Sequence, residues 1–201
     1  MSATGTEKAS PAASPLQMAQ NRKNSINVAR KEAHAFRGEL IDRFAQFERS
    51  LGPVLVLALA LPEYAAVAKK PAHLLGQKIE QLNKIVGTEG PLNGLANGIV
   101  ANLEALRRYE KARHWMAHAT LEIVQAESDE LLYLFRLTRA GEQSVDQSTI
   151  VISKVEAKSI GSALGTIVDI LTRQLDELGK LQRSKFTHLP IVATAPPDRA
   201  V

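Results

Sequence analysis

Apolar residues recur every three or four positions through the first half of the chain, with charged residues between them. Between about Ile26 and Ser50 this spacing predicts an amphipathic helix, which Gly52-Pro53 is expected to end. A second, shorter helix is expected to continue to about Val67, before a break at Lys69-Lys70-Pro71. The apolar positions of the first helix are Ala33, Phe36, Leu40, Phe44, Phe47 and Leu51.

The helical spacing continues into the middle of the chain. Residues 72–86 predict a third helix, which a glycine-containing loop follows. A longer helix is expected over residues 92–118, where the apolar side chains again fall at helical intervals. Its apolar face would carry Leu95, Ile99, Leu103, Leu106 and Tyr109.

The pattern then changes to one that is typical of strands. Residues 131–138 and 149–155 are rich in strand-forming residues, and the polar segment between them contains Gly141. These features predict a β-hairpin with a long loop. From about Glu156 the helical period returns and predicts a last long amphipathic helix. The expected fold is therefore mainly α, a helical bundle with one β-hairpin inserted before the last long helix.

The two ends of the chain differ from its body. Residues 1–20 are rich in Ala, Ser, Thr and Pro, so a disordered leader is expected over residues 1–24. A single helical domain is expected over residues 25–183, and a flexible tail over residues 184–201. The most apolar run, Val54 to Leu61, is far shorter than the roughly 20 residues that span a bilayer. Because the start of the chain also lacks the layout of a secretory signal, we expect a cytoplasmic protein with no membrane partner.

Composition narrows the candidate chemistry. The chain of 201 residues carries a formal net charge of +4, which is compatible with an anionic partner such as RNA. It has no cysteine, so it can form neither disulfides nor thiolate metal sites. It contains no nucleophilic serine or cysteine motif and no dinucleotide-binding fingerprint. We therefore expect no cofactor.

The densest chemical cluster lies at the expected end of the long central helix. Arg113, His114 and His118 stand there, in a chain that has only 5 histidines. A histidine can transfer a proton near neutral pH, and an arginine can bind and neutralise a phosphate. These three residues are the candidate catalytic residues. The candidate RNA-binding cations, just before them in the chain, are Arg107, Arg108 and Lys111.

Four residues separate Arg113 from His118, and His114 follows the arginine directly. This arrangement resembles the R-x4-H signature of HEPN domains, in which Asn, Asp or His typically follows the arginine. The segment 113–119 is also similar to the "RNxxAHG" segment of a bacterial type, in which a helix, a hairpin and a closing helix follow one another. The chain departs from that segment at His114, where Asn is commoner, and at Ala119, where Gly is commoner. The resemblance covers roughly residues 26–183.

The resemblance implies a homodimer that brings two copies of the motif close together. In catalytic HEPN domains the arginine and histidine promote attack of an RNA 2′-hydroxyl on the adjacent phosphate, without a metal ion. It implies that His118 is the general acid or base and that Arg113 stabilises the charge of the phosphorane. His114 would orient the phosphate or assist proton transfer. The protein would then be an HEPN-like RNA-binding protein and a metal-independent endoribonuclease.

Other interpretations of the same residues stay open. The R-x4-H spacing recurs at Arg183 to His188, and histidines at a helix end can simply interact with its exposed carbonyls. The alternative function is then a non-catalytic helical dimer that acts as an interaction or regulatory module. A metal site is a further alternative, because acids and histidines recurring every four residues would share one face of a continuous helix. No HExxH motif and no ligand from another helix is evident, so we assign no metal. The residues on that face are Glu110, His114, His118 and Glu122.

Overall fold

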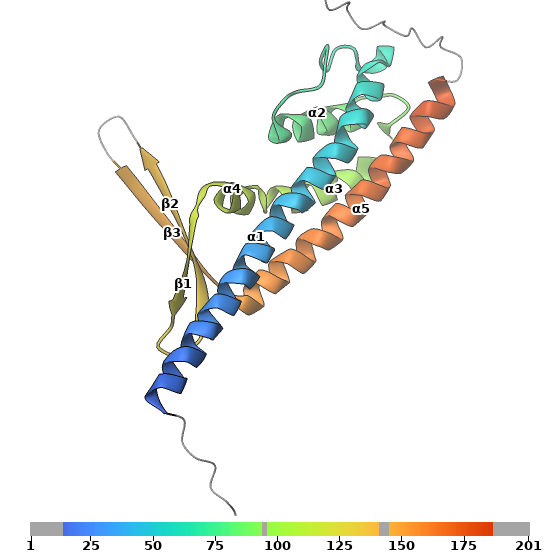
Figure 1. Ribbon diagram of the computed structural model, residues 1–201. Helices are drawn as coiled ribbons and strands as arrows, with labels where there is room; N and C mark the ends of the chain where they lie inside the picture. Colours follow the sequence, from blue (N-terminus) through green and yellow to red (C-terminus); the bar gives the residue numbers. More distant parts are fainter. Residues whose placement is uncertain (1–13, 94–95, 141–144, 187–201) are drawn as a thin grey trace, which may run out of the picture. The chain divides into compact units, whose positions relative to one another are not determined.

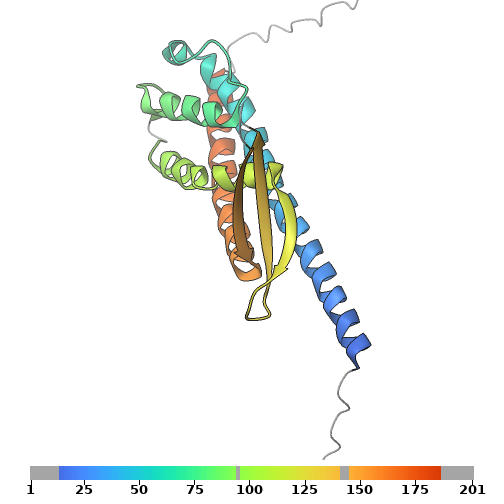
Figure 2. The same cartoon turned by 90° about the vertical axis from the view of Figure 1, so that its left-hand side faces the viewer.

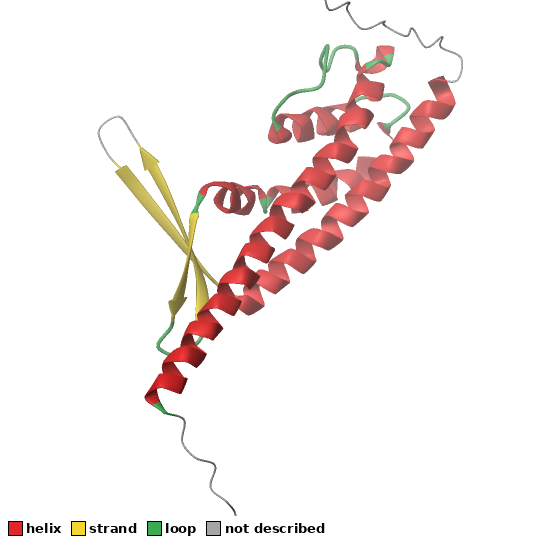
Figure 3. Cartoon of the chain, viewed as in Figure 1, coloured by secondary structure: helices red, strands yellow, loops and turns green. Residues whose placement is uncertain are grey.

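The computed structural model describes residues 14–93, 96–140 and 145–186 (Figures 1 and 3). The predicted fold class is confirmed: the chain is mainly α-helical, with a small antiparallel sheet before the last long helix. The elements are α1 (Pro15–Leu59), the 3-10 helix η1 (Pro62–Tyr64), α2 (Leu75–Gly87), α3 (Ala96–Arg107), α4 (Glu110–His118), β1 (Thr120–Gln125), β2 (Leu131–Ala140), β3 (Val145–Ser153) and α5 (Lys154–Phe186).

The chain divides into two compact units. Unit 1 comprises Met1–Leu40 and His114–Gly161, and unit 2 comprises Ile41–Arg113 and Ser162–Val201. Each unit is therefore built from two separate stretches of the chain. The three boundaries fall inside helices α1, α4 and α5, so each of these helices contributes residues to both units.

Helix α1 continues through Gly52-Pro53, where the sequence predicts a helix end. A proline inside a helix removes one backbone hydrogen bond and normally costs about 3 kcal/mol. Pro53 and Arg49, whose carbonyl loses that bond, are both exposed, so water can hydrate the carbonyl. The neighbours Leu51, Val54 and Leu55 are buried, and their packing holds the helix together. The first part of the predicted second helix belongs to α1, which runs to Leu59, and η1 replaces the part towards Val67.

The start of α1 also differs from the prediction. The helix begins at Pro15, so residues 15–24 are helical where a disordered leader is expected from the sequence. Residues 1–13 lie outside the described part of the chain. The predicted flexible tail over residues 184–201 overlaps the end of α5, which extends to Phe186, and its remainder also lies outside the described part.

Residues 92–118 form two helices, α3 and α4, where the sequence predicts one. The Tyr109 N–H donates to the Leu106 carbonyl three residues earlier (2.9 Å), which closes a tight turn between the helices. On one straight helix Leu106 and Trp115 would point to opposite sides, because nine residues correspond to two and a half turns. Both side chains are nevertheless buried. The break in the helix allows each of them to be buried within its own unit.

Unit 1 contains a sheet of three antiparallel strands in the order β1-β2-β3, rather than the predicted hairpin (Figure 2). The strand that the prediction omits is β1, which pairs with β2 from Thr120 opposite Arg136 to Gln125 opposite Leu131. Strands β2 and β3 form the expected hairpin, in which Leu132 lies opposite Ser153. One face of the sheet supplies core residues to unit 1, namely Tyr133, Phe135 and Leu137.

Unit 2 has its own apolar core, and one buried polar group organises a loop beside it. The Tyr64 hydroxyl is buried and accepts a hydrogen bond from the Leu92 N–H (2.9 Å). Burial raises the pKa of Tyr64 above its ordinary value. Gly90 approaches the same ring so closely that an added Cβ would lie 2.7 Å from the hydroxyl oxygen. The core side chains of unit 2 include Phe44, Phe47, Leu82, Ile85, Leu103 and Leu171.

Candidate functional site

The predicted catalytic segment forms helix α4, which is short and begins with an acidic residue. Glu110, an acidic residue, lies in the first turn of α4 and His118, a basic residue, in its last turn, which is the order that suits the helix dipole. The boundary between the two units falls inside this helix, between Arg113 and His114.

In unit 1 the structure brings His114 and His118 together. They are one helical turn apart on α4, and their ring centroids are 4.9 Å apart at an interplanar angle of 51°. Both side chains are exposed, whereas Trp115 and Met116 between them are buried and anchor the helix to the core. Two imidazoles are thus presented to solvent on a helix whose other face is fixed.

Arg37 of α1 secures the end of α4 and was not identified from the sequence. Its guanidinium donates one hydrogen bond to the Ala117 carbonyl and one to the Ala119 carbonyl, each of 3.2 Å. These two carbonyls lie on either side of His118 in the chain. The cation therefore satisfies backbone groups that a helix C-terminus leaves free, and it fixes the backbone that carries His118.

The segment leaves α4 for strand β1 directly after Ala119. This alanine is buried, and its N–H donates to the Trp115 carbonyl (2.9 Å). Among the described non-glycine residues, only Asp129 has a positive φ. The turn at Ala119 therefore does not need the glycine that is commoner at this place in the bacterial segment.

In unit 2 the side chain of Arg113 is exposed and lies over an aromatic ring. Its guanidinium carbon is 5.9 Å from the centroid of the Phe44 ring. A cation within about 6 Å of a ring centroid is attracted to the face of the ring. Phe44 is a core residue of α1, so the contact positions Arg113 while leaving the guanidinium open to solvent.

The three predicted RNA-binding cations are all exposed residues of unit 2. Arg107 forms an ion pair with Glu80 of α2, with 3.9 Å between Nη2 and Oε1. An exposed pair of this length is weak and readily exchanged for another anion. Arg108 lies in the turn between α3 and α4, and Lys111 lies in the first turn of α4.

The helical face proposed for a metal ion is not continuous. Helix α4 ends at His118, and Glu122 lies on β1, where its carboxylate accepts a hydrogen bond from Arg136 (3.5 Å). Oε1 of Glu110 is buried and has no hydrogen-bond partner in the described structure. Within residues 14–93, 96–140 and 145–186, no group of three or more His, Cys, Asp and Glu side chains is arranged to hold a metal ion.

Comparison of the chain with family models, with curated proteins and with solved structures gave no match. The resemblance to HEPN domains therefore rests on the residues of the motif and on the order of the elements around it. No helix in the described part of the chain is long and apolar enough to cross a membrane.

Proposed function

We propose that the chain is an HEPN-like RNA-binding protein that cleaves RNA without a metal ion, through Arg113, His114 and His118. The observation that supports this most directly is the pair of exposed imidazoles at the end of α4, with centroids 4.9 Å apart. Side chains at this separation can contact the same phosphodiester group. The chain has no cysteine, which accords with a cytoplasmic location for such an enzyme.

The reaction needs two proton transfers and one stabilised anion. The RNA 2′-oxygen attacks the adjacent phosphorus while a neutral imidazole removes the 2′-hydroxyl proton. The bond between phosphorus and the 5′-oxygen breaks, and a protonated imidazole gives its proton to that leaving oxygen. The products are a 2′,3′-cyclic phosphate and a free 5′-hydroxyl. His118 is the principal proton-transfer group, His114 assists it or orients the phosphate, and Arg113 neutralises the phosphorane.

A homodimer is part of this proposal, because of the geometry of a helix. Residues five apart on an α-helix point about 140° away from each other. The side chains of Arg113 and His118 on the same α4 therefore point in different directions around the helix. If Arg113 of one copy approaches His118 of a second copy, both side chains can reach one phosphate without distorting either helix.

Arg108 and Lys111 give the proposed RNA its electrostatic attraction, and Arg107 adds to it after release from Glu80. The logarithm of the RNA affinity falls as the logarithm of the salt concentration rises, and each contact between a cation and a phosphate of single-stranded RNA steepens this fall by about 0.7. Removing Arg108 or Lys111 is therefore expected to make the RNA affinity less sensitive to salt.

The first prediction concerns cleavage of RNA by the purified full chain in EDTA. We expect wild-type protein to cut a mixed RNA pool and to leave 2′,3′-cyclic phosphate ends. His118→Ala is expected to lower the rate by about 10²–10⁴-fold, the usual contribution of one acid–base group. Arg113→Ala is expected to lower it by about 10²–10³-fold, the usual contribution of one group that stabilises transition-state charge. His34→Ala is the matched control, because His34 is also an exposed histidine on a helix of unit 1.

Circular dichroism establishes that each variant is folded before its activity is compared. Cleavage that survives EDTA, is retained in His34→Ala and is lost in the other two variants supports the proposal. Folded His118→Ala protein that cuts as fast as wild type removes the catalytic assignment. RNA binding without any cleavage leaves the alternative of a non-catalytic binding module.

A further inference from the structure

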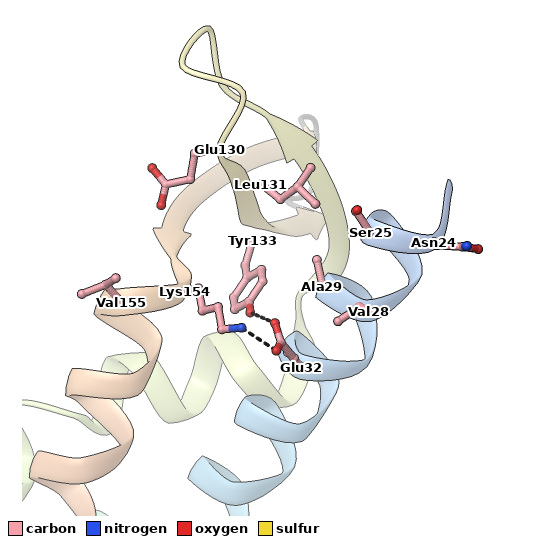
Figure 4. Close-up of a pocket in the computed structure, with 10 residues that line it drawn as sticks. All are labelled: Asn24, Ser25, Val28, Ala29, Glu32, Glu130, Leu131, Tyr133, Lys154 and Val155. Carbon is pink, nitrogen blue, oxygen red and sulfur yellow. Dashed lines mark hydrogen bonds and ion pairs between the residues drawn. The ribbon is translucent and has the colours of Figure 1, made fainter. Parts of the chain in front are cut away.

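A recess of about 570 Å³ lies within unit 1, and none of its lining residues belongs to the R-x4-H segment (Figure 4). Its walls come from α1, from the start of β2 and from the start of α5. Sites for small organic ligands usually have volumes of about 300–1,000 Å³, so the recess is large enough for one. Nothing in the proposed RNA chemistry uses it.

The recess has apolar walls that are open to solvent. Val28 on α1 is 55% exposed and Val155 on α5 is 75% exposed, although both are aliphatic. Tyr133, only 2% exposed, extends from β2 between these two helices (Figure 4). A ligand lying between the two valines would remove apolar surface from water, which is favourable in proportion to the area buried.

The recess has more negatively charged groups than positively charged ones. Glu32 accepts a hydrogen bond from the Lys154 ammonium at 2.6 Å, and the Tyr133 hydroxyl lies 3.5 Å from its other carboxylate oxygen. The interaction with Glu32 raises the pKa of Lys154, and burial raises that of Tyr133, so one is a cation and the other a neutral donor at neutral pH. Glu130 is exposed, and within the described residues its carboxylate has no ion-pair partner. Two carboxylates against one ammonium leave the recess with a net negative charge.

We propose that this recess binds an organic ammonium ion with an apolar body. The apolar body lies between Val28 and Val155, and the ammonium group meets the carboxylate of Glu130. An anionic ligand fits poorly, because Lys154 already pairs with Glu32 and because Glu130 would repel it. The same chemistry is offered by a free amine and by a lysine side chain of a peptide.

Titration of the ¹⁵N-labelled full chain, followed by amide chemical shifts, tests the proposal. The probes are n-hexylamine, n-hexanol and n-hexanoate, which share a chain length and differ in charge. We expect hexylamine to shift the amides of Val28, Tyr133 and Val155, hexanol to bind more weakly and hexanoate not to bind. An acetylated and amidated Leu-Lys-Leu peptide separates the two sources. Tighter binding than hexylamine identifies a lysine side chain, and weaker binding identifies a free amine.

Two pairs of variants locate the binding site. Glu130→Gln is expected to weaken hexylamine binding about two- to five-fold, as for a solvent-exposed ion pair. Glu127→Gln makes the same change in the same exposed turn outside the recess and is expected to have no effect. Val155→Ser is expected to weaken hexylamine and hexanol alike, whereas Val56→Ser, at another exposed valine on a helix of unit 2, leaves both unchanged.

Three results would overturn the proposal. The first is equal binding of hexanoate and hexylamine, because the charge would then not be recognised. The second is a set of shifted amides that lies outside the recess. The third is an equal effect of Glu127→Gln and Glu130→Gln. None of these results depends on whether the protein cleaves RNA, since no probe contains a phosphate and no variant alters Arg113, His114 or His118.

Discussion

The placement of His118 depends on Arg37, which donates to the carbonyls of both residues that flank the histidine in the chain. A guanidinium presents its N–H donors in a rigid planar fork, which suits two neighbouring carbonyls. Arg37 touches no proposed reacting atom and is therefore a positioning residue. Its effect on catalysis would pass entirely through the backbone at the end of α4.

The second prediction follows from this role. Arg37→Ala is expected to lower the RNA cleavage rate at saturating RNA by about 10- to 100-fold, because small displacements of a catalytic group are costly. The apparent RNA affinity should change little, since Arg37 is not among the proposed RNA contacts. The free energy of unfolding should fall by about 1–2 kcal/mol for the lost hydrogen bonds. Kinetics and urea unfolding measure the two effects separately.

Arg30→Ala is the matched control, because Arg30 is an exposed arginine on the same helix. Arg37→Lys should restore only part of the rate, since an ammonium cannot bridge both carbonyls as a planar fork does. A rate in Arg37→Ala equal to that in Arg30→Ala would show that the end of α4 is fixed without this arginine.

Residues such as Arg37 could not be found from the sequence, whereas the histidines could. Arg113, His114 and His118 are neighbours in the chain, so their spacing alone singles them out. Arg37 bonds to carbonyls 80 and 82 positions away, and Glu32 bonds to residues 101 and 122 positions away. On an amphipathic helix such residues have the pattern of a solvated face. Only the fold reveals their partners.

At the level of elements, the transition from β3 to α5 is made without a loop. Ser153 is the last residue of β3, and its hydroxyl oxygen accepts from the Glu156 N–H (3.1 Å). The Glu156 carboxylate in turn accepts from the Ser153 N–H (2.8 Å) and hydroxyl (2.9 Å). This reciprocal pair is a capping box, and it satisfies two backbone donors at the helix start.

The third prediction concerns the Ser153 hydroxyl, which makes two of the three hydrogen bonds of the capping box. Ser153→Ala is expected to lower the free energy of unfolding by about 1 kcal/mol at pH 7, the usual cost of losing an N-cap. Ser159→Ala, an exposed serine inside α5, should be neutral or slightly stabilising, because alanine is the better helix former. Urea unfolding of both variants checks this. Equal losses would show that the cap contributes nothing specific.

The same box gives a dependence on pH. Hydrogen bonds from the Ser153 N–H and hydroxyl lower the pKa of Glu156 below its ordinary value of 4.5. A depressed folded-state pKa stabilises the protein above the unfolded pKa, and this stabilisation is lost as the pH falls through the folded-state pKa. The difference between wild type and Ser153→Ala should therefore shrink below pH 4. A difference that stays constant down to pH 2 would contradict this account.

Element boundaries show where the periodicity of the sequence is sufficient and where it fails. It predicts the body of α5, because Leu164, Leu171 and Leu178 recur at helical spacing and are all buried. The periodicity misses β1, because this strand has only six residues, comes soon after the end of α4, and is too short to show a clear alternation of apolar and polar residues. It also predicts a helix end at Pro53, where packing on both sides outweighs the lost hydrogen bond. Tertiary burial decides these cases, and a single sequence does not display it.

At the level of the whole molecule, the two units share the long helices α1 and α5 and the short helix α4. The unit boundaries fall between Leu40 and Ile41 in α1, between Arg113 and His114 in α4, and between Gly161 and Ser162 in α5. If one unit unfolded alone, these helices would have to end at these points. Each new end would leave up to four backbone N–H or C=O groups without helical partners. Separate unfolding therefore carries a cost that a flexible linker between domains would not impose.

The fourth prediction is that the two units unfold in one transition. Trp115 is the only tryptophan of the chain and is buried in unit 1, so its fluorescence reports on that unit. Leu171 is fully buried in unit 2, and Leu171→Ala is expected to cost about 2–5 kcal/mol. If the shared helices couple the units, this substitution shifts the fluorescence midpoint in urea as much as the midpoint of the helical circular dichroism signal. Val56→Ala, at an exposed position of unit 2, should shift neither midpoint appreciably.

A fluorescence midpoint that stays at the wild-type value while the dichroism midpoint falls would show that α1 and α5 can each end at the unit boundary, and that unit 1 is stable without unit 2.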